Sequence, residues 1–133
     1  MSTNEGKRLR ALRGAITVPE NDRAAIVAAT SELLEALMAR NGVDADDLVS
    51  MIFTATRDLD AEFPAIAARR LGLAHVPLLC SVELDVAGAM PRCVRVLVHL
   101  YTERGPDELQ HVYLREAREL RTDLAGSNPE GDL

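Results

Sequence analysis

Two arginines interrupt otherwise apolar strand-like runs, and they are the residues most able to do chemistry here. Arg95 stands in Cys93–Val98 (CVRVLV), and Arg13 alternates with small and apolar residues along 9–15. A guanidinium ion buried in such a run costs several kcal/mol unless it is paired. One interpretation is a structural ion pair. The other is an anchor for an anionic ligand, because arginine binds carboxylates through two parallel hydrogen bonds.

Carboxylates and a thiol occupy the next apolar run. Glu83 and Asp85 end the stretch that begins at Pro77, and Cys80 lies within it. The two acids are the obvious internal partners for the arginines, so they keep the ion-pair interpretation open. Cys80 is typical of a packed small hydrophobe, and no neighbour in sequence supplies the base that a nucleophilic thiol needs.

The aromatic and metal-binding side chains are few. Phe63 and Tyr113 each fit either a packing role or a place in a pocket wall. The three histidines are scattered and no Cys-x-x-Cys occurs, so no metal site is expected. With only two Phe and two Tyr, stacking on nucleic acid is not expected.

Charge and hydropathy exclude several classes of protein. Fifteen basic residues against 21 acidic ones give a net charge of -6, which disfavours a nucleic-acid partner. No apolar run is long enough to cross a membrane, and the first residues lack the apolar core of a signal peptide. We therefore expect a cytoplasmic protein with no membrane partner, whose two cysteines form no disulfide framework.

The elements that must position these side chains alternate along the chain. Hydrophobic periodicity and turn residues predict strands at 8–18, 48–56, 76–85, 94–102 and 111–114. A helix follows Pro19–Asp22 and stops at Asn41–Gly42, and a short one spans 63 to about 71 with Pro64 in its first turn. A single helical turn starts at Asp107, and Glu116–Leu120 favours helix.

This order predicts an α+β fold: a mixed sheet of about five strands with two helices on one face, in a ferredoxin-like layering. The domain is expected over 8–124, between flexible tails at 1–7 and 125–133. Two helices on one face leave the other face of the sheet bare, and an assembly of copies is the natural way to cover it.

Five segments, in order, resemble the monofunctional chorismate mutases of the trimeric α/β type. They are Leu12–Val18 (LRGAITV), Ala55–Ala65 (ATRDLDAEFPA), Val76–Val86 (VPLLCSVELDV), Cys93–Val96 (CVRV) and His111–Leu114 (HVYL). The resemblance covers about 8–124. It implies a pseudo-barrel homotrimer with sites between subunits that converts chorismate to prephenate, for phenylalanine and tyrosine synthesis, without cofactor or metal.

The resemblance also implies roles for particular residues. Arg95 would bond the ether oxygen and a substrate carboxylate, and Arg13 and Tyr113 would hold the enolpyruvyl carboxylate. Glu83 and Cys80 would contact the ring hydroxyl or the ring edge. The other implied contacts are Phe63, Ala65 and Arg69 from the neighbouring subunit, Leu79 at the rim, and Leu120 and Arg121 near the entrance.

Alternation along a strand adds a geometric prediction. Cys80 and Glu83 are three residues apart, so regular pleating points them to opposite faces. Each site should then take Glu83 from one subunit and Cys80 from the next.

Two positions depart from the family pattern, and one rival function stays open. The family usually has Lys where this chain has Ile66, and often Thr where it has Leu79. Losing a rim cation would weaken capture of a dianion, chiefly through KM. The rival is a non-catalytic, anion-binding trimer of the same architecture.

Overall fold

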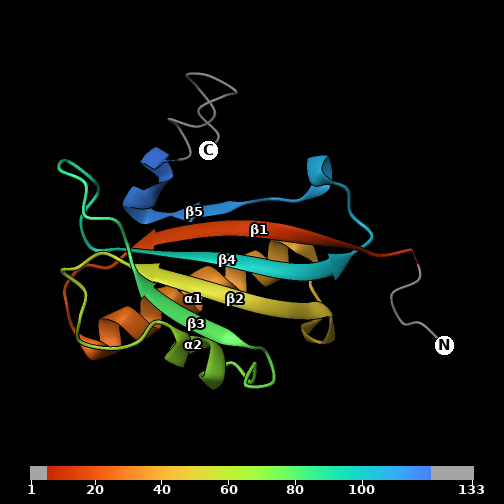
Figure 1. Cartoon of the computed structure of the whole chain (residues 1–133), viewed down its shortest axis with the longest axis horizontal. Helices are drawn as coiled ribbons and strands as arrows, with labels where there is room; N and C mark the ends of the chain where they lie inside the picture. The colour runs from red at the N-terminus through yellow and green to blue at the C-terminus, as the bar shows by residue number, and fades with distance from the viewer. Residues whose placement is uncertain (1–5, 121–133) are drawn as a thin grey trace.

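The computed structural model describes residues 6–120, which form one five-stranded mixed sheet with two helices on one face (Figure 1). The strands are β1 (Arg8–Thr17), β2 (Leu48–Ala55), β3 (Leu78–Val82), β4 (Cys93–Thr102) and β5 (Val112–Leu114). The helices are α1 (Arg23–Asn41) and α2 (Ala65–Arg70), with 3-10 turns η1 (Ala45–Asp47), η2 (Pro106–Glu108) and η3 (Arg115–Ala117). The predicted α+β class and the order of elements are confirmed.

The sheet order is β3-β2-β4-β1-β5. Strand β4 is antiparallel to both β1 and β2, whereas β3 runs parallel to β2 and β5 parallel to β1. This order places β4, which carries Arg95, at the centre of the sheet. It also brings the chain's first and last strands side by side.

Helix α1 begins and ends where its capping residues predict. The Asp22 carboxylate accepts a hydrogen bond from the Ala25 amide at 3.0 Å, and Gly42 closes the helix at φ 57°, in the left-handed region that glycine tolerates. The buried stripe packs on the sheet and consists of Ile26, Val27, Ala29, Thr30, Leu33, Leu34 and Leu37. The core therefore lies between α1, α2 and one face of the sheet.

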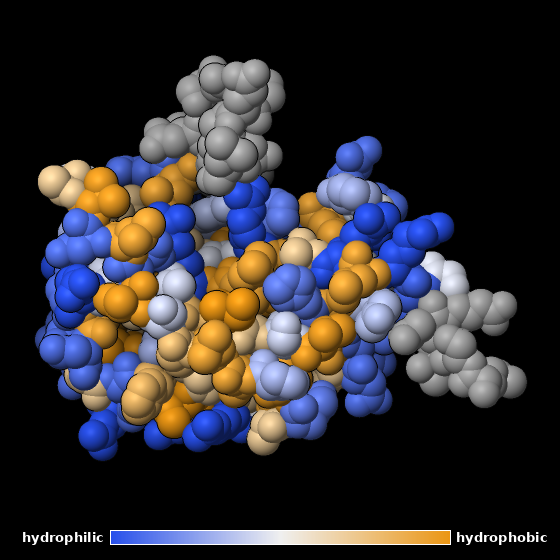
Figure 2. All heavy atoms as spheres, in the orientation of Figure 1, coloured by the Kyte–Doolittle hydropathy of each residue, from blue (hydrophilic) through white to orange (hydrophobic). Residues whose placement is uncertain are grey.

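Neither α1 nor α2 covers the opposite face of the sheet. Along β4, Val94, Val96, Val98 and Leu100 are buried in the core, whereas Arg95 and its alternate neighbours point to the other side. Figure 2 looks onto this uncovered face and shows hydrophobic residues gathered over its middle. Leu9 and Leu79, on β1 and β3, are 53% and 60% exposed.

Two sequence-based expectations about the strands are wrong. Strand β3 is shorter than the predicted 76–85, because Pro77 has no amide to donate and the chain turns away after Glu83. Arg95 is not buried: its side chain is 47% exposed. The face that Arg13 shares with Leu9 and Ala11 is likewise the uncovered one, and the core side of β1 carries Leu12, Gly14 and Ile16.

Gly14 allows α1 to approach β1 closely, directly beneath the residues that flank it. A Cβ at this position would lie 2.9 Å from Leu37 Cδ1 and 3.0 Å from Leu33 Cδ1. Atoms that close must move apart, which forces either the helix or its leucines to shift. The backbone of Arg13 and Ala15 depends on this contact.

We predict that Gly14→Ala lowers the free energy of unfolding by about 1–2 kcal/mol, because overpacking outweighs the entropy that alanine removes from the unfolded chain. Urea unfolding at fixed protein concentration measures it. Gly105→Ala is the matched control, since a Cβ there meets only Glu108 Oε1, at 3.6 Å. Equal stability of the two variants would contradict the close approach.

Candidate active site

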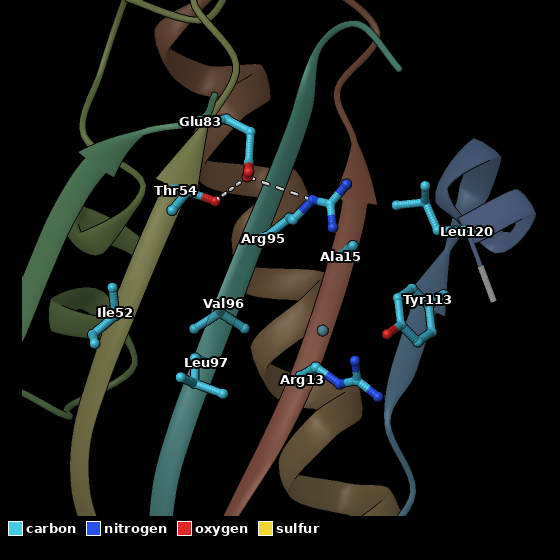
Figure 3. Close-up of a pocket in the computed structure, with 11 residues that line it drawn as sticks. Arg13, Ala15, Ile52, Thr54, Glu83, Arg95, Val96, Leu97, Tyr113 and Leu120 are labelled. Atoms are coloured by element: carbon cyan, nitrogen blue, oxygen red, sulfur yellow. Dashed lines mark hydrogen bonds and ion pairs between the residues drawn. The ribbon is translucent and has the colours of Figure 1, made fainter. Parts of the chain in front are cut away.

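A cleft of about 520 Å³ opens on the uncovered face of the sheet (Figure 3). Its charged lining consists of Arg13 on β1, Arg95 on β4 and Glu83, the residue after β3. Two guanidinium groups against one carboxylate leave this lining positive, in a chain whose net charge is -6. The other lining residues are Gly14, Ala15, Ile52, Thr54, Val96, Leu97, Tyr113 and Leu120.

Arg95 and Glu83 form an ion pair inside this cleft. Arg95 Nε lies 3.5 Å from Glu83 Oε2, and the Glu83 side chain is 26% exposed. Arg95 therefore fits both interpretations made from the sequence. It forms an ion pair with an internal acid, and that pair lines a cleft where an anionic ligand could bind. Figure 3 shows the terminal nitrogens of Arg95 turned away from Glu83. They are the part of the guanidinium group left to meet a ligand.

Glu83 is held by strand β2 as well as by Arg95. Its amide donates to the Ala55 carbonyl at 2.9 Å, which prolongs the β2–β3 pairing beyond Val82. Its Oε2 accepts a 2.6 Å hydrogen bond from the Thr54 hydroxyl. Asp85, the other acid considered as an internal partner for the arginines, instead has its Oδ2 3.7 Å from Arg57 Nε, and both of these side chains are exposed.

The start of β4 is fixed by a loop network next to the cleft. Arg92 has φ 47°, and its amide donates to both Asp58 oxygens at 3.1 and 3.0 Å. The Cys93 amide donates to Thr56 Oγ1 at 3.0 Å. The Val18 amide donates to the Arg92 carbonyl, and Arg92 Nε donates to the Val18 carbonyl. This network sets the strand two residues before Arg95.

Contacts from residues 111–115 hold the C-terminal side of the cleft against β1. The Arg13 amide donates to His111 Nδ1 at 3.0 Å, and Tyr113 lies opposite Ala15 in the β1–β5 register. Arg115, at φ 56°, binds the Thr17 carbonyl at 3.2 Å and Glu32 at 2.9 Å. These contacts place η3, and the helical residues 118–120 that follow it, above the end of β1.

A small apolar cluster lies beneath that segment. Ala15, Cys93 and Ala117 are buried in it, with Tyr113 and Leu120 packed partly against them. Burial raises the pKa of the Cys93 thiol above its ordinary value, and Arg95 opposes this shift only in part. Cys93 is thus a packing residue and Leu120 a wall of the cleft.

The remaining predicted residues lie elsewhere in the same chain. Phe63 and Cys80 line a second hollow of about 670 Å³, whose charged lining consists of Arg23, Arg57, Asp60 and Glu62. Glu83 and Cys80 therefore occupy separate hollows of one chain, as strand alternation predicts. Ala65 is 8% exposed, and neither it nor the exposed Arg69 and Leu79 lines either hollow. Arg121 lies outside the described residues.

The family departures also have a clear placement. Ile66 is half-buried and packs against the main core, so α2 brings no cation there. Leu79 stands exposed on the edge strand β3. Among the described residues no group of three or more metal-binding side chains converges, and no helix is long and apolar enough to span a membrane.

Sequence reasoning missed Thr54 and the Asp58–Arg92 network. Thr54 shares a face with Ile52 by simple alternation, but only the strand register puts it opposite Arg95. The Asp58 network depends on loop geometry, for which the sequence carries no periodic signal.

The fold is that of a small α+β protein, with a cleft lined by two arginines on the bare face of its mixed sheet. The family model described as "Chorismate mutase type I" matches residues 9–124. The chain belongs to this family.

The individual relatives match this chain over most of their own length. The chain is 48% identical over 117 residues to a protein named chorismate mutase AroH from Thermus thermophilus, covering 87% of this chain and 96% of the relative. It is 40% identical over 118 residues to the Bacillus subtilis protein of the same name, covering 88% and 93%. A solved chorismate mutase from Clostridium thermocellum has a TM-score of 0.82 at 45% identity, covering 83% of this chain and 98% of that one.

The environments of the two cysteines predict different thiol reactivities. Cys93 is 2% exposed with a raised pKa, so less of it is thiolate at any given pH, whereas the half-buried Cys80 faces a hollow. An aromatic disulfide reagent near pH 8 should modify one thiol fast and one slowly. Cys80→Ser should remove the fast phase. Survival of that phase in Cys80→Ser would contradict the placement.

Proposed function

We propose that this chain is a chorismate mutase, which rearranges chorismate to prephenate in the cleft that holds Arg95 and Glu83. Family membership and the named relatives support the activity. The observation that carries the site is the Arg95 guanidinium group, which reaches over the cleft and is paired with Glu83 through Nε. The cytoplasmic location expected from the sequence stays a prediction.

The reaction asks for charge and shape and needs no nucleophile. Chorismate is a dianion, and Arg13 and Arg95 offer two cations to its carboxylates. In the transition state the C–O bond breaks ahead of C–C bond formation, so negative charge grows on the ether oxygen. A preplaced guanidinium group stabilises that charge by about 3–4 kcal/mol, or ~10²–10³ in rate. Holding the substrate in its reactive diaxial shape lowers the barrier further.

Glu83 and Tyr113 take complementary parts at the two ends of the cleft. The ring becomes electron-poor as the ether oxygen leaves, and a carboxylate nearby stabilises that positive charge while accepting a hydrogen bond from the ring hydroxyl. Tyr113 lies beside Arg13, on the opposite side of Arg95 from Glu83 (Figure 3). In the proposed complex its hydroxyl group donates to the enolpyruvyl carboxylate. Leu97 and Ile52 give this charged site an apolar floor.

The complete site forms between copies of the chain. One copy contributes the cleft, and the next contributes the hollow with Phe63 and Cys80, because one chain holds the two sets apart. The bare sheet face and the exposed Leu79 and Val82 on edge strand β3 support a contact between copies. The resemblance gives three copies in a cyclic arrangement. The contacts that the resemblance implies for Ala65, Arg69, Leu79 and Arg121 stay predictions.

We predict that Arg95→Ala lowers kcat/KM for chorismate by at least ~10²-fold, because it removes the cation at the developing oxyanion. The loss of chorismate absorbance in the ultraviolet gives the rate. Arg40→Ala, which removes an exposed guanidinium group at the far end of α1, is the control and should match the unmodified protein. A decrease of less than tenfold for Arg95→Ala would refute the assignment of this residue.

Mixing two inactive variants tests the shared site. Arg95→Ala spoils the cleft and Cys80→Asp spoils the hollow by placing a carboxylate against a dianion. If sites join two chains, random co-assembly should restore about one site in four. The double variant Arg95→Ala/Cys80→Asp, co-assembled with either single variant, should restore none. Sedimentation gives the number of copies. A mixture as inactive as its parents would mean that each chain builds its own site.

A further inference from the structure

Thr54 lines the cleft from β2, on the same face of the sheet as Arg95. In the sheet register its neighbours are Arg95 on β4 and Ser81 on β3, and directly opposed residues in a sheet point to the same face. Glu83 follows Ser81 by two residues. The Glu83 carboxylate therefore lies between the Thr54 hydroxyl and the Arg95 guanidinium group (Figure 3).

The contact from Thr54 to Glu83 is the shorter of the two that the carboxylate makes. The hydroxyl donates to Oε2 at 2.6 Å, within the range of a hydroxyl bonded to a charged carboxylate. Arg95 Nε reaches the same oxygen at 3.5 Å, which is outside good hydrogen-bonding distance. One oxygen thus takes both contacts, and within residues 6–120 the structure gives no other side-chain partner to Glu83.

This geometry differs from the one that the two ions would choose alone. An arginine and a carboxylate prefer a close, bidentate pair through two parallel N–H···O bonds. Such a pair would occupy one terminal nitrogen of Arg95 together with Nε and both oxygens of Glu83. Thr54 is β-branched and stiff at χ1, so its hydroxyl holds the carboxylate on the β2 side.

We propose that Thr54 is a positioning residue that keeps Glu83 from closing onto Arg95. With Oε2 tethered, the terminal nitrogens of Arg95 stay turned toward the ligand and Oε1 stays available to accept from a ligand hydroxyl. The proposal rests on the proposed function, because it assigns Thr54 to the same cleft and the same reaction. It predicts that loss of the hydroxyl group lowers the rate even where the β-branched shape of the side chain is kept.

The test compares three variants in the intact assembly. Thr54→Val keeps the shape and removes the donor, and its kcat/KM should fall about tenfold, mostly through kcat, since a hydrogen bond to a charged group is lost at the reacting centre. Thr54→Ser restores the donor and should recover the rate to within about threefold. Ser50→Ala removes a hydroxyl of the same strand that bonds His99 at 3.2 Å, and should leave the rate unchanged. Thermal unfolding confirms that all three are folded.

A cycle with Glu83→Ala separates this inference from the proposed function. If Thr54 acts through Glu83, then Thr54→Val costs about tenfold in the unmodified protein and close to nothing in the Glu83→Ala background. Equal costs in both backgrounds, or no rescue by serine, would overturn the role of Thr54 while leaving Glu83 in place. If Glu83→Ala alone costs less than tenfold, the proposed role of Glu83 fails, and that of Thr54 fails with it.

Discussion

The site depends on one pair of opposite charges held slightly apart on the bare face of a sheet. Arg95 and Glu83 approach to 3.5 Å, and their side chains are 47% and 26% exposed. A partly exposed pair of this kind contributes little to stability. Its value lies in orientation, because the carboxylate occupies one edge of the guanidinium group and leaves the other edge for an anionic ligand. Several contacts in the surrounding structure hold the strands that carry these two side chains in place.

These supporting contacts lie on three sides of the ion pair. Gly14 lets helix α1 support β1 from behind, and the Asp58–Arg92 contact fixes the start of β4. On the C-terminal side, Arg115 ties η3 to β1 and to α1. Arg92 and Arg115 both adopt positive φ, which is costly for a residue with a side chain and persists only where several contacts impose it. Rigid support of this kind suits a site that works by preorganised charge.

Much of this fold follows from the sequence because its signals are local. The apolar stripe and caps of α1 predict the helix with its correct ends, and strand alternation separates Cys80 from Glu83. Arg95 is the instructive failure. The run CVRVLV looks apolar on both sides because the bare face is itself partly apolar, with Leu97 beside Arg95. Periodicity identifies two faces but cannot say which one the helices cover, and it carries no information on register, which alone places Thr54 beside the ion pair.

In the proposed function, preplaced charge in this cleft accelerates the rearrangement of a bound dianion. The most direct measurement is the first-order loss of chorismate with the purified protein, compared with the uncatalysed reaction in the same buffer, with prephenate identified as the product. We expect acceleration by several orders of magnitude with no cofactor added. Loss of chorismate at the uncatalysed rate, from a protein that still binds the dianion, would contradict it and leave an anion-binding protein in its place.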